Sequence, residues 1–321
     1  MTVENTATGR GPFGARRLMP LIVWVSVALG VLVLVLTGEM GNMIDAFSDA
    51  DWWLIAPLLA VGCALPIVHA RRWQVMLRSL EHDLSLESAI DLTITSTMIN
   101  YAAPGYLWSP AKGLLARQMY GIGLGRSVPT LAVEQVVDAF ALVVGTILGL
   151  ILAGPVISRE ILDRLSAPSA GILAVAVLAL VAIVAIGLFV VWRFGRRFAV
   201  NLAEAARLLA RDRSLRVPVV EFTAARWVLD TLAIWLAAKA LGVSLGLSAL
   251  ILISNLPLLI GLISPMPGGI GFREGAMAGV AGVMALPVAA ILAAAILHRA
   301  ALLLALPIVL AAIRLRRWAL A

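Results

Sequence analysis

Several ionisable side chains lie within apolar stretches of this sequence, where a charge is costly and usually faces a cavity or a charged partner. Glu134 and Asp138 are spaced i,i+4, so a helix places both carboxylates on one face. They can carry protons, contact a ligand, or form a structural ion pair. Arg226 and Asp230 repeat this spacing with the opposite sign first, which favours an internal ion pair.

A second group of charged residues follows the run Pro265-Met-Pro-Gly-Gly-Ile-Gly-Phe. Arg273 and Glu274 come directly after this run, and His298 and Arg299 lie in the middle of a later apolar stretch. A guanidinium group can hold a phosphate with two parallel hydrogen bonds. We therefore expect Arg273 or Arg299 to bind a phosphate or to compensate a buried carboxylate.

Proline and glycine interrupt two segments, at Pro104-Gly105 within 86–120 and at Pro267-Gly268 within 244–285. Both segments are too polar or too broken for one ordinary membrane span, so each is predicted to form a helical hairpin. The second helix of each hairpin should begin just after its break and point free N–H groups toward it. Two such positive helix ends would suit an anionic group such as a lipid phosphate.

The elements that position these residues must lie in a membrane. Hydrophobic residues make up 62% of the 321 residues and charged residues only 13%, whereas soluble domains are about one quarter charged. Apolar stretches of about 20 residues are long enough to cross the hydrocarbon core. The predicted fold is all-α: six membrane helices and two oppositely oriented re-entrant hairpins. The six spans are expected near 20–37, 53–70, 128–153, 171–192, 219–241 and 288–313.

Charge orients the predicted spans. Basic residues favour the cytoplasmic side at Arg16 and Arg17, at Arg71, Arg72 and Arg78, in the stretch 193–216, and at Arg314, Arg316 and Arg317. Both termini are therefore expected in the cytoplasm, with the chain in the cell membrane. The loop 38–51 carries acidic and no basic residues and is expected outside. His69, at the inner end of the second span, is expected at the membrane interface. The segment 1–19 is interpreted as a cytoplasmic tail, and 20–321 as one transmembrane domain. Its half-repeats, about 20–155 and 170–315, form an inverted repeat, which is typical of transporters with a binding site at the membrane midplane.

Composition also excludes several functions. The single cysteine, Cys63, permits no intrachain disulfide and no thiol pair for a metal. The net charge of +7 reflects basic loops beside apolar spans, so no nucleic-acid partner is expected. The sequence contains no phosphate-binding Gly-x-x-x-x-Gly-Lys-Ser/Thr run. We expect no cofactor, no metal and no catalytic residues.

The motif from Pro265 to Glu274 resembles that of the lysylphosphatidylglycerol synthase transmembrane, or flippase-like, family. Asn100, Pro104-Gly105, Lys112-Gly113 and Arg117, followed by an acidic pair in the next span, agree with the first half of its pattern. The resemblance extends from about residue 20 to 315. It implies a membrane domain that moves a polar-headed lipid between leaflets. The soluble aminoacyl-transferase domain of the full-length synthases is absent from this sequence, so lipid synthesis is not supported.

The expected function is a lipid flippase or scramblase, not an enzyme. Its cargo would be an anionic or aminoacylated phospholipid or a lipid-linked sugar. The alternatives are a non-transporting membrane partner of a lipid-synthesis enzyme and a membrane enzyme that acts on a lipid phosphate. Expected partners are membrane lipids and a separately encoded lipid-modifying enzyme or glycosyltransferase, and a homo-oligomer is compatible with the sequence. The expected substrate-binding residues are Asn100, Pro104, Gly105, Lys112, Arg117, Glu134, Asp138, Pro267, Gly268, Gly269, Arg273, Glu274 and Arg299.

Overall fold

The computed structural model describes residues 39–79, 82–102, 108–165, 207, 213–264, 266 and 268–320. These residues are almost entirely helical and contain no strand, so the all-α prediction is confirmed for this part of the chain. The N-terminal tail and the predicted spans at 20–37 and 171–192 lie outside the described residues.

Three described stretches are long and apolar enough to cross a membrane: Trp52–Arg78, Ser127–Arg159 and Val288–Ala319. They correspond to η1 (Trp52–Leu54) with α3 (Ile55–Arg78), to α6 (Leu124–Leu165) and to α11 (Val288–Leu320). Each overlaps a predicted span and extends beyond it. A fourth long helix, α8 (Arg213–Ala240), covers the span predicted at 219–241 but is less apolar, because it carries Glu221, Arg226 and Asp230.

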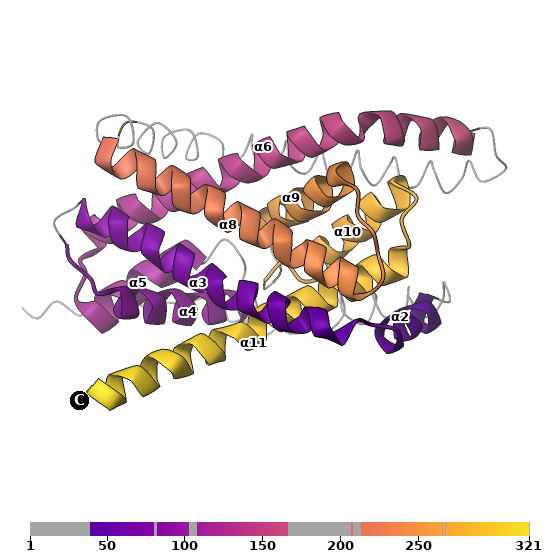
Figure 1. Ribbon diagram of the computed structural model, residues 1–321. Helices are drawn as coiled ribbons and strands as arrows, with labels where there is room; N and C mark the ends of the chain where they lie inside the picture. The colour runs from indigo at the N-terminus through magenta and orange to yellow at the C-terminus, as the bar shows by residue number, and fades with distance from the viewer. Residues whose placement is uncertain are drawn as a thin grey trace, which may run out of the picture.

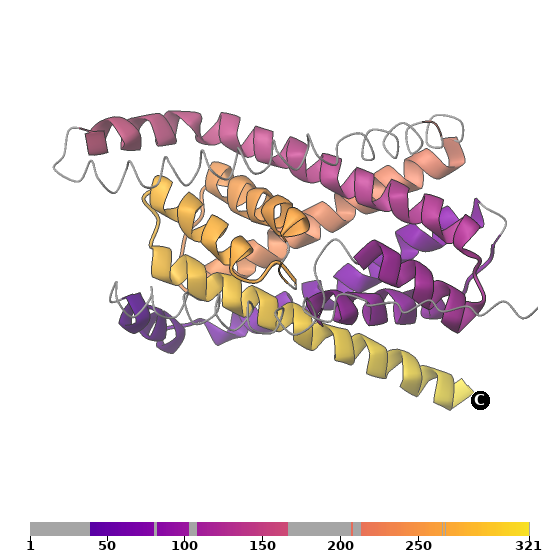
Figure 2. The ribbon, with the colours of Figure 1, turned by 180° about the vertical axis from the view of Figure 1, so that it is seen from behind.

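Two pairs of shorter helices pack against the long ones. Helix α4 (Leu86–Ala102) contacts α5 (Trp108–Tyr120), and α9 (Leu247–Ile263) contacts α10 (Phe272–Val283). Each predicted hairpin segment thus contains two described helices, and the second helices begin where the sequence predicted. The two pairs lie at opposite ends of the long helices (Figures 1 and 2).

The two ends of the molecule differ in the chain segments they contain. The C-terminus lies at the end formed by α4 and α5 (Figure 1). Helix α2 (Glu39–Ser48) lies near the opposite end, where it packs against α11. The sequence predicted an external loop at 38–51; most of it is instead this short helix.

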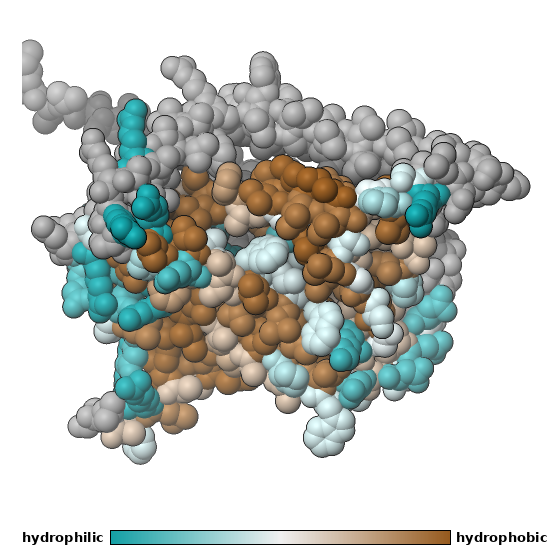
Figure 3. Space-filling view, turned by 45° about the horizontal axis from the view of Figure 1, so that its top comes forward, coloured by the Kyte–Doolittle hydropathy of each residue, from teal (hydrophilic) through white to brown (hydrophobic). Residues whose placement is uncertain are grey.

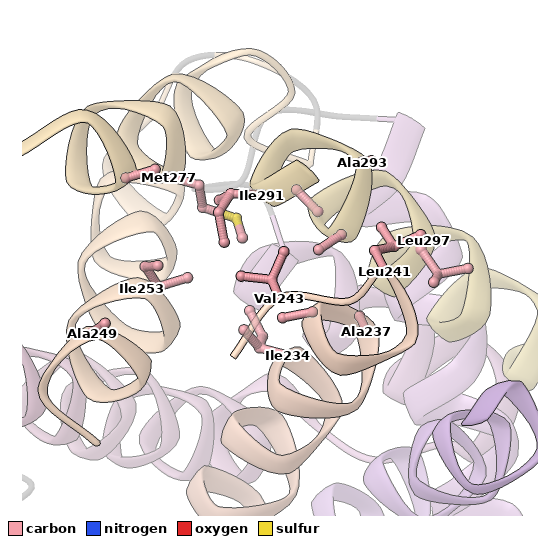
Figure 4. Packing of buried hydrophobic residues seen from close by; sticks show 14 of the residues in the cluster. Ile234, Ala237, Leu241, Val243, Ala249, Ile253, Met277, Ile291, Ala293 and Leu297 are labelled. Atoms are coloured by element: carbon pink, nitrogen blue, oxygen red, sulfur yellow. The ribbon is translucent and has the colours of Figure 1, made fainter. Parts of the chain in front are cut away.

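The hydrophobic core consists of two clusters. One joins the C-terminal half of α8 to α9, α10 and the first half of α11, where Ala237, Ile253, Met277 and Ile291 pack together (Figure 4). The other joins the second half of α3 to α4, α5, the start of α6 and the last half of α11. The two clusters occupy opposite ends of the same long helices. The middle turns of these helices therefore lie between the clusters and can carry polar side chains.

Small residues let α6 and α9 approach closely. A Cβ atom at Gly149 would lie only 2.9 Å from the Cα atom of Leu252, and one at Gly145 would overlap the amide of Asn255. Glycines four residues apart on a helix face allow this kind of backbone contact between membrane helices. The close approach places Asn255 where it accepts a hydrogen bond from Trp227 Nε1 of α8, at 2.6 Å.

The described surface has the polarity of a membrane protein. In Figure 3, hydrophobic side chains form a broad band across the visible face, and hydrophilic side chains gather toward the two ends. Exposed apolar side chains follow one another along α6, including Val144, Ile147, Leu148 and Ile151. Hydrocarbon rather than water is the natural environment of such a surface.

The contact between α6 and α9 leads to a prediction for one glycine and a matched control. Gly149→Ala should lower the unfolding free energy by about 1–3 kcal/mol, because the added methyl group meets backbone that cannot move aside. Gly154→Ala, on the same helix, adds a methyl group with no atom within 4 Å and should be neutral or slightly stabilising. Unfolding of the purified variants in detergent measures both. Equal stability of the two variants would contradict the close contact.

Candidate functional site

A cavity of about 260 Å³ lies between the middle turns of the long helices. Helices α3, α6, α8 and α11 contribute residues near their centres, and α9 contributes residues of its second half. Thr97 of α4, Gly268 and Arg273 of α10 complete the wall. This position falls between the two hydrophobic clusters described above. The ionisable residues that line the cavity are His69, Asp138, Arg226, Asp230, Arg273 and His298.

The remaining cavity wall is mostly apolar. It includes the leucine side chains Leu65, Leu142, Leu258, Leu262, Leu302 and Leu306. Charged groups and leucines therefore line the same space. A polar group with an attached hydrocarbon chain matches this combination better than a fully polar solute does.

The charged wall lies deep along the membrane-spanning stretches. Asp138 is about 16 Å along α6 from Ser127, where the apolar stretch begins, at 1.5 Å per residue. That distance is roughly half of the hydrocarbon thickness. Ionisable groups at such a depth persist only beside opposite charges or in a wet cavity. Asp138 has two arginines beside it and also lines the cavity.

A group of ion pairs, which we call the buried charge network, surrounds Asp138 and consists of Arg72, Lys112, Glu134, Asp138 and Arg226. Arg72 of α3 is only 1% exposed, and its two terminal nitrogens reach both Asp138 oxygens at 2.5 and 2.9 Å. Arg72 also donates to Glu134 at 3.2 Å. The network joins helices far apart in the sequence through charges that are buried or partly buried.

Glu134 connects the network to the first helix pair. Its carboxylate is fully buried and lies 2.9 Å from Lys112 Nζ of α5, which is also fully buried. On its other side, His69 Nε2 lies 2.5 Å from Glu134 Oε1, and His69 lines the cavity. A continuous line of polar contacts therefore runs from the hairpin helix α5 to the cavity wall.

Arg226 lies where the network meets the cavity. Its side chain is 30% exposed and forms ion pairs with Asp138 and, at 3.5 Å, with Asp230. The i,i+4 pair predicted between Arg226 and Asp230 is confirmed. Arg226 is thus the cation of the network that contacts Asp138 and is also exposed to the cavity.

Arg273 reaches the cavity from the first turn of α10, and two glycines make room for its stem. A Cβ atom at Gly261 would lie 2.6 Å from Arg273 Cγ, and one at Gly269 would lie 3.2 Å from it. Gly269 also has a φ of 68°, a conformation that favours glycine. Gly269 of the Gly-Gly pair is therefore needed to make room for this arginine side chain.

Glu274 and Arg299 hold the break before α10 in shape. The backbone N–H of Gly271 donates to Glu274 Oε2 at 2.7 Å, and Arg299 Nη2 lies 2.8 Å from Glu274 Oε1. Arg299 also donates to the carbonyl oxygen of Gly268 at 3.3 Å. The expected compensation between an arginine and Glu274 is therefore present, with Arg299 as the cation.

His298 adds a neutral polar group to the cavity. Its side chain is 4% exposed, and its Nε2 atom has no hydrogen-bond partner among the described residues. A buried polar atom without a partner is uncommon in native proteins and often indicates a missing ligand or water. His298 lines the cavity on the α11 side.

The structure places three of the predicted substrate-binding residues in the cavity wall: Asp138, Gly268 and Arg273. Lys112 and Glu134 belong instead to the buried charge network, where each neutralises the other. Their geometry gives them a positioning role between α5 and α6.

The other predicted residues lie elsewhere. Gly269, Glu274 and Arg299 shape the break before α10, as described above. Arg117 is exposed on α5 and does not line the cavity. Asn100 belongs to α4 and its side chain is not described, while Pro104, Gly105 and Pro267 lie outside the described residues.

The sequence interpretation omitted several residues that the structure brings to the site. Arg72 had been grouped with Arg71 and Arg78 as a marker of the cytoplasmic edge, but it is buried in the network. His69 was expected at the membrane interface and instead contacts Glu134. The i,i+4 pair and His298 were noticed in the sequence, yet only their placement around one cavity shows that they share a site. Among the described residues, no group of three or more His, Cys, Asp or Glu side chains could hold a metal ion.

The pair formed by Lys112 and Glu134 gives a stability prediction. Lys112→Met and Glu134→Gln should each lower the unfolding free energy by about 3–5 kcal/mol, because each removes one charge from a fully buried ion pair. The double variant should cost less than the sum of the two, by about 0.5–3 kcal/mol. Unfolding in mixed micelles measures all three.

The exposed ion pair between Arg78 and Asp83 is the matched control. Arg78→Met should change the unfolding free energy by no more than about 0.5 kcal/mol. Strictly additive costs for Lys112→Met and Glu134→Gln would show that the buried pair is not energetically coupled.

Comparison with known proteins agrees with this architecture. The chain is 23% identical over 282 residues to a UPF0104 membrane protein of Methanothermobacter thermautotrophicus, covering 80% of this chain and 82% of that protein. No solved structure matches this chain significantly. The family model for the lysylphosphatidylglycerol synthase TM region matches residues 23–311, almost the entire length of the sequence. The chain therefore belongs to the lysylphosphatidylglycerol synthase TM region family, as its sequence motifs predicted.

Proposed function

We propose that this protein is a flippase or scramblase that moves a polar-headed lipid between the two leaflets of the cell membrane. The observation that carries the proposal is the cavity at mid-depth, which is lined by charged side chains and by leucines together. A headgroup in this cavity would contact the charges, while its acyl chains remain in hydrocarbon. Transfer of the headgroup across the apolar core is the costly step of lipid exchange, and a charged cavity lowers that cost.

The arrangement of the helix pairs supports alternating exposure of the cavity. The pair α4–α5 and the pair α9–α10 lie at opposite ends of the long helices, as two oppositely oriented re-entrant hairpins would (Figure 1). The break before α10 contributes Gly268 to the cavity wall, and the first turn of α10 contributes Arg273. The other pair is connected to that wall through Lys112, Glu134 and His69. Movement of either pair would therefore change one end of the cavity.

The orientation follows from charge. Basic residues Arg314, Arg316 and Arg317 lie near the C-terminus, at the end of the molecule that holds α4 and α5. The positive-inside rule assigns this end to the cytoplasm. Arg316 and Arg317 also contact Glu87 of α4, at 3.5 and 3.1 Å, which joins α11 to the cytoplasmic hairpin.

Leaflet exchange of fluorescent phospholipids in proteoliposomes tests the proposal. The intact protein should exchange at least one anionic, zwitterionic or aminoacylated lipid. Asp230→Asn and Arg273→Ala should slow exchange at least tenfold, because each removes a charge from the cavity wall. Lys239→Gln is the matched control, since it removes an exposed cation from the same helix as Asp230 and should leave exchange unchanged. Equal exchange by protein-free vesicles and by all variants would refute lipid transport through this cavity.

A further inference from the structure

We propose that the cavity is a selective site for a singly charged phosphate ester, held by Arg273, Arg226 and His298. The proposal rests on the proposed function for the origin of the phosphate in a lipid headgroup. The residues of the cavity would bind a soluble phosphate ester through the same contacts.

The charge balance of the cavity and its network selects a monoanion. The network and the cavity wall together hold four cations, Arg72, Lys112, Arg226 and Arg273, and three carboxylates, Glu134, Asp138 and Asp230. His69 and His298 count as neutral, the main form of an unperturbed imidazole at pH 7. Among the described residues one positive charge is therefore left over at membrane depth. A ligand with one negative charge, such as a phosphodiester, neutralises it.

Arg226 can contact such a ligand without leaving Asp138 unbalanced. Both oxygens of Asp138 already accept hydrogen bonds from Arg72, at 2.5 and 2.9 Å. Arg226 therefore supplies a second cation to a carboxylate that already has one. Its partial exposure to the cavity leaves room for its fork of N–H groups to turn toward a phosphate.

The glycines around Arg273 hold its side chain in one direction, and this also suits phosphate binding. Gly261 and Gly269 lie against its methylene stem, so that its direction is fixed by packing. Arg273 and Arg226 come from different helices, α10 and α8, and line one cavity. Two guanidinium groups on separate elements can bind two oxygens of one phosphate.

His298 supplies the third contact. Its buried Nε2 atom has no hydrogen-bond partner among the described residues, and it faces the same cavity as the two arginines. A neutral imidazole can donate one N–H group to a phosphate oxygen without adding charge. Binding would thus satisfy a polar atom that is otherwise buried without a partner.

The size of the cavity indicates which part of a lipid enters. Its volume of about 260 Å³ is below the roughly 300–1,000 Å³ of pockets that enclose drug-sized ligands. A phosphate with a small headgroup fits, whereas a diacyl chain does not. The leucines of the cavity wall provide apolar surface beside the charged groups, and the acyl chains would extend from there into hydrocarbon.

Calorimetric titration of the purified protein in a maltoside detergent, which carries no phosphate, tests the site. The probes are dihexanoylphosphatidylglycerol, dihexanoylglycerol and glycerophosphoglycerol, a soluble phosphodiester with one negative charge. Dihexanoylphosphatidylglycerol should bind at least tenfold more tightly than dihexanoylglycerol. Arg273→Gln, His298→Gln and Gly261→Ala should each weaken its binding at least tenfold, the last because it displaces the Arg273 stem. Lys239→Gln should bind as the intact protein does.

Each outcome has a separate meaning. Equal binding of dihexanoylglycerol, no binding of dihexanoylphosphatidylglycerol, or full affinity in folded Arg273→Gln and His298→Gln would overturn the phosphate site. Equal binding of glycerophosphoglycerol would support the phosphate site but identify a soluble ester as its source. Binding without leaflet exchange would support this site and contradict the proposed flippase. Leaflet exchange that survives in Arg273→Gln and His298→Gln would contradict this phosphate site and would still support lipid transport by the protein.

Discussion

Charge at membrane depth is the constraint on which the rest of this structure depends. Arg72, Lys112, Glu134 and Asp138 lie in or beside apolar helices, where an unpaired ion costs several kcal/mol. Each is stable only because a helix distant in sequence brings an opposite charge within hydrogen-bond distance. The positions of α3, α5, α6 and α8 relative to one another are therefore tied to these ion pairs as much as to apolar packing.

Packing at the two ends makes the polar centre possible. Alanine-rich contacts among α8, α9, α10 and α11 fill one end, and the larger side chains of α3, α4 and α6 fill the other. Between them the middle turns keep charged and histidine side chains around a cavity. The glycines at 149, 261 and 269 permit close approach at the points where a methyl group would separate helices or displace Arg273. A frame that is packed at both ends around a polar interior suits the proposed transport of a lipid headgroup.

Much of the fold follows from hydropathy and from the positions of proline and glycine. The helix pairs at both breaks and three apolar spans were predictable, because each depends on local sequence. The site was predicted only in part. Asp138 and Arg273 were identified as charged residues in apolar surroundings, but Arg72 looked like a cytoplasmic marker because it follows Arg71 near a helix end. Its burial depends on Asp138, 66 positions away, and no local pattern encodes that pairing.

At membrane depth, one side of α6 should face a water-accessible polar cavity, and the other side should face hydrocarbon. Thiol labelling in a Cys63→Ser background tests it most directly, with cysteines introduced one at a time at Ala141, which lines the cavity, and Ile147, which is exposed on the outer surface. In proteoliposomes, a charged methanethiosulfonate reagent should modify Ala141→Cys and leave Ile147→Cys unmodified. Modification of Ile147→Cys with Ala141→Cys protected would contradict the account, because it would place the water on the wrong face of the helix.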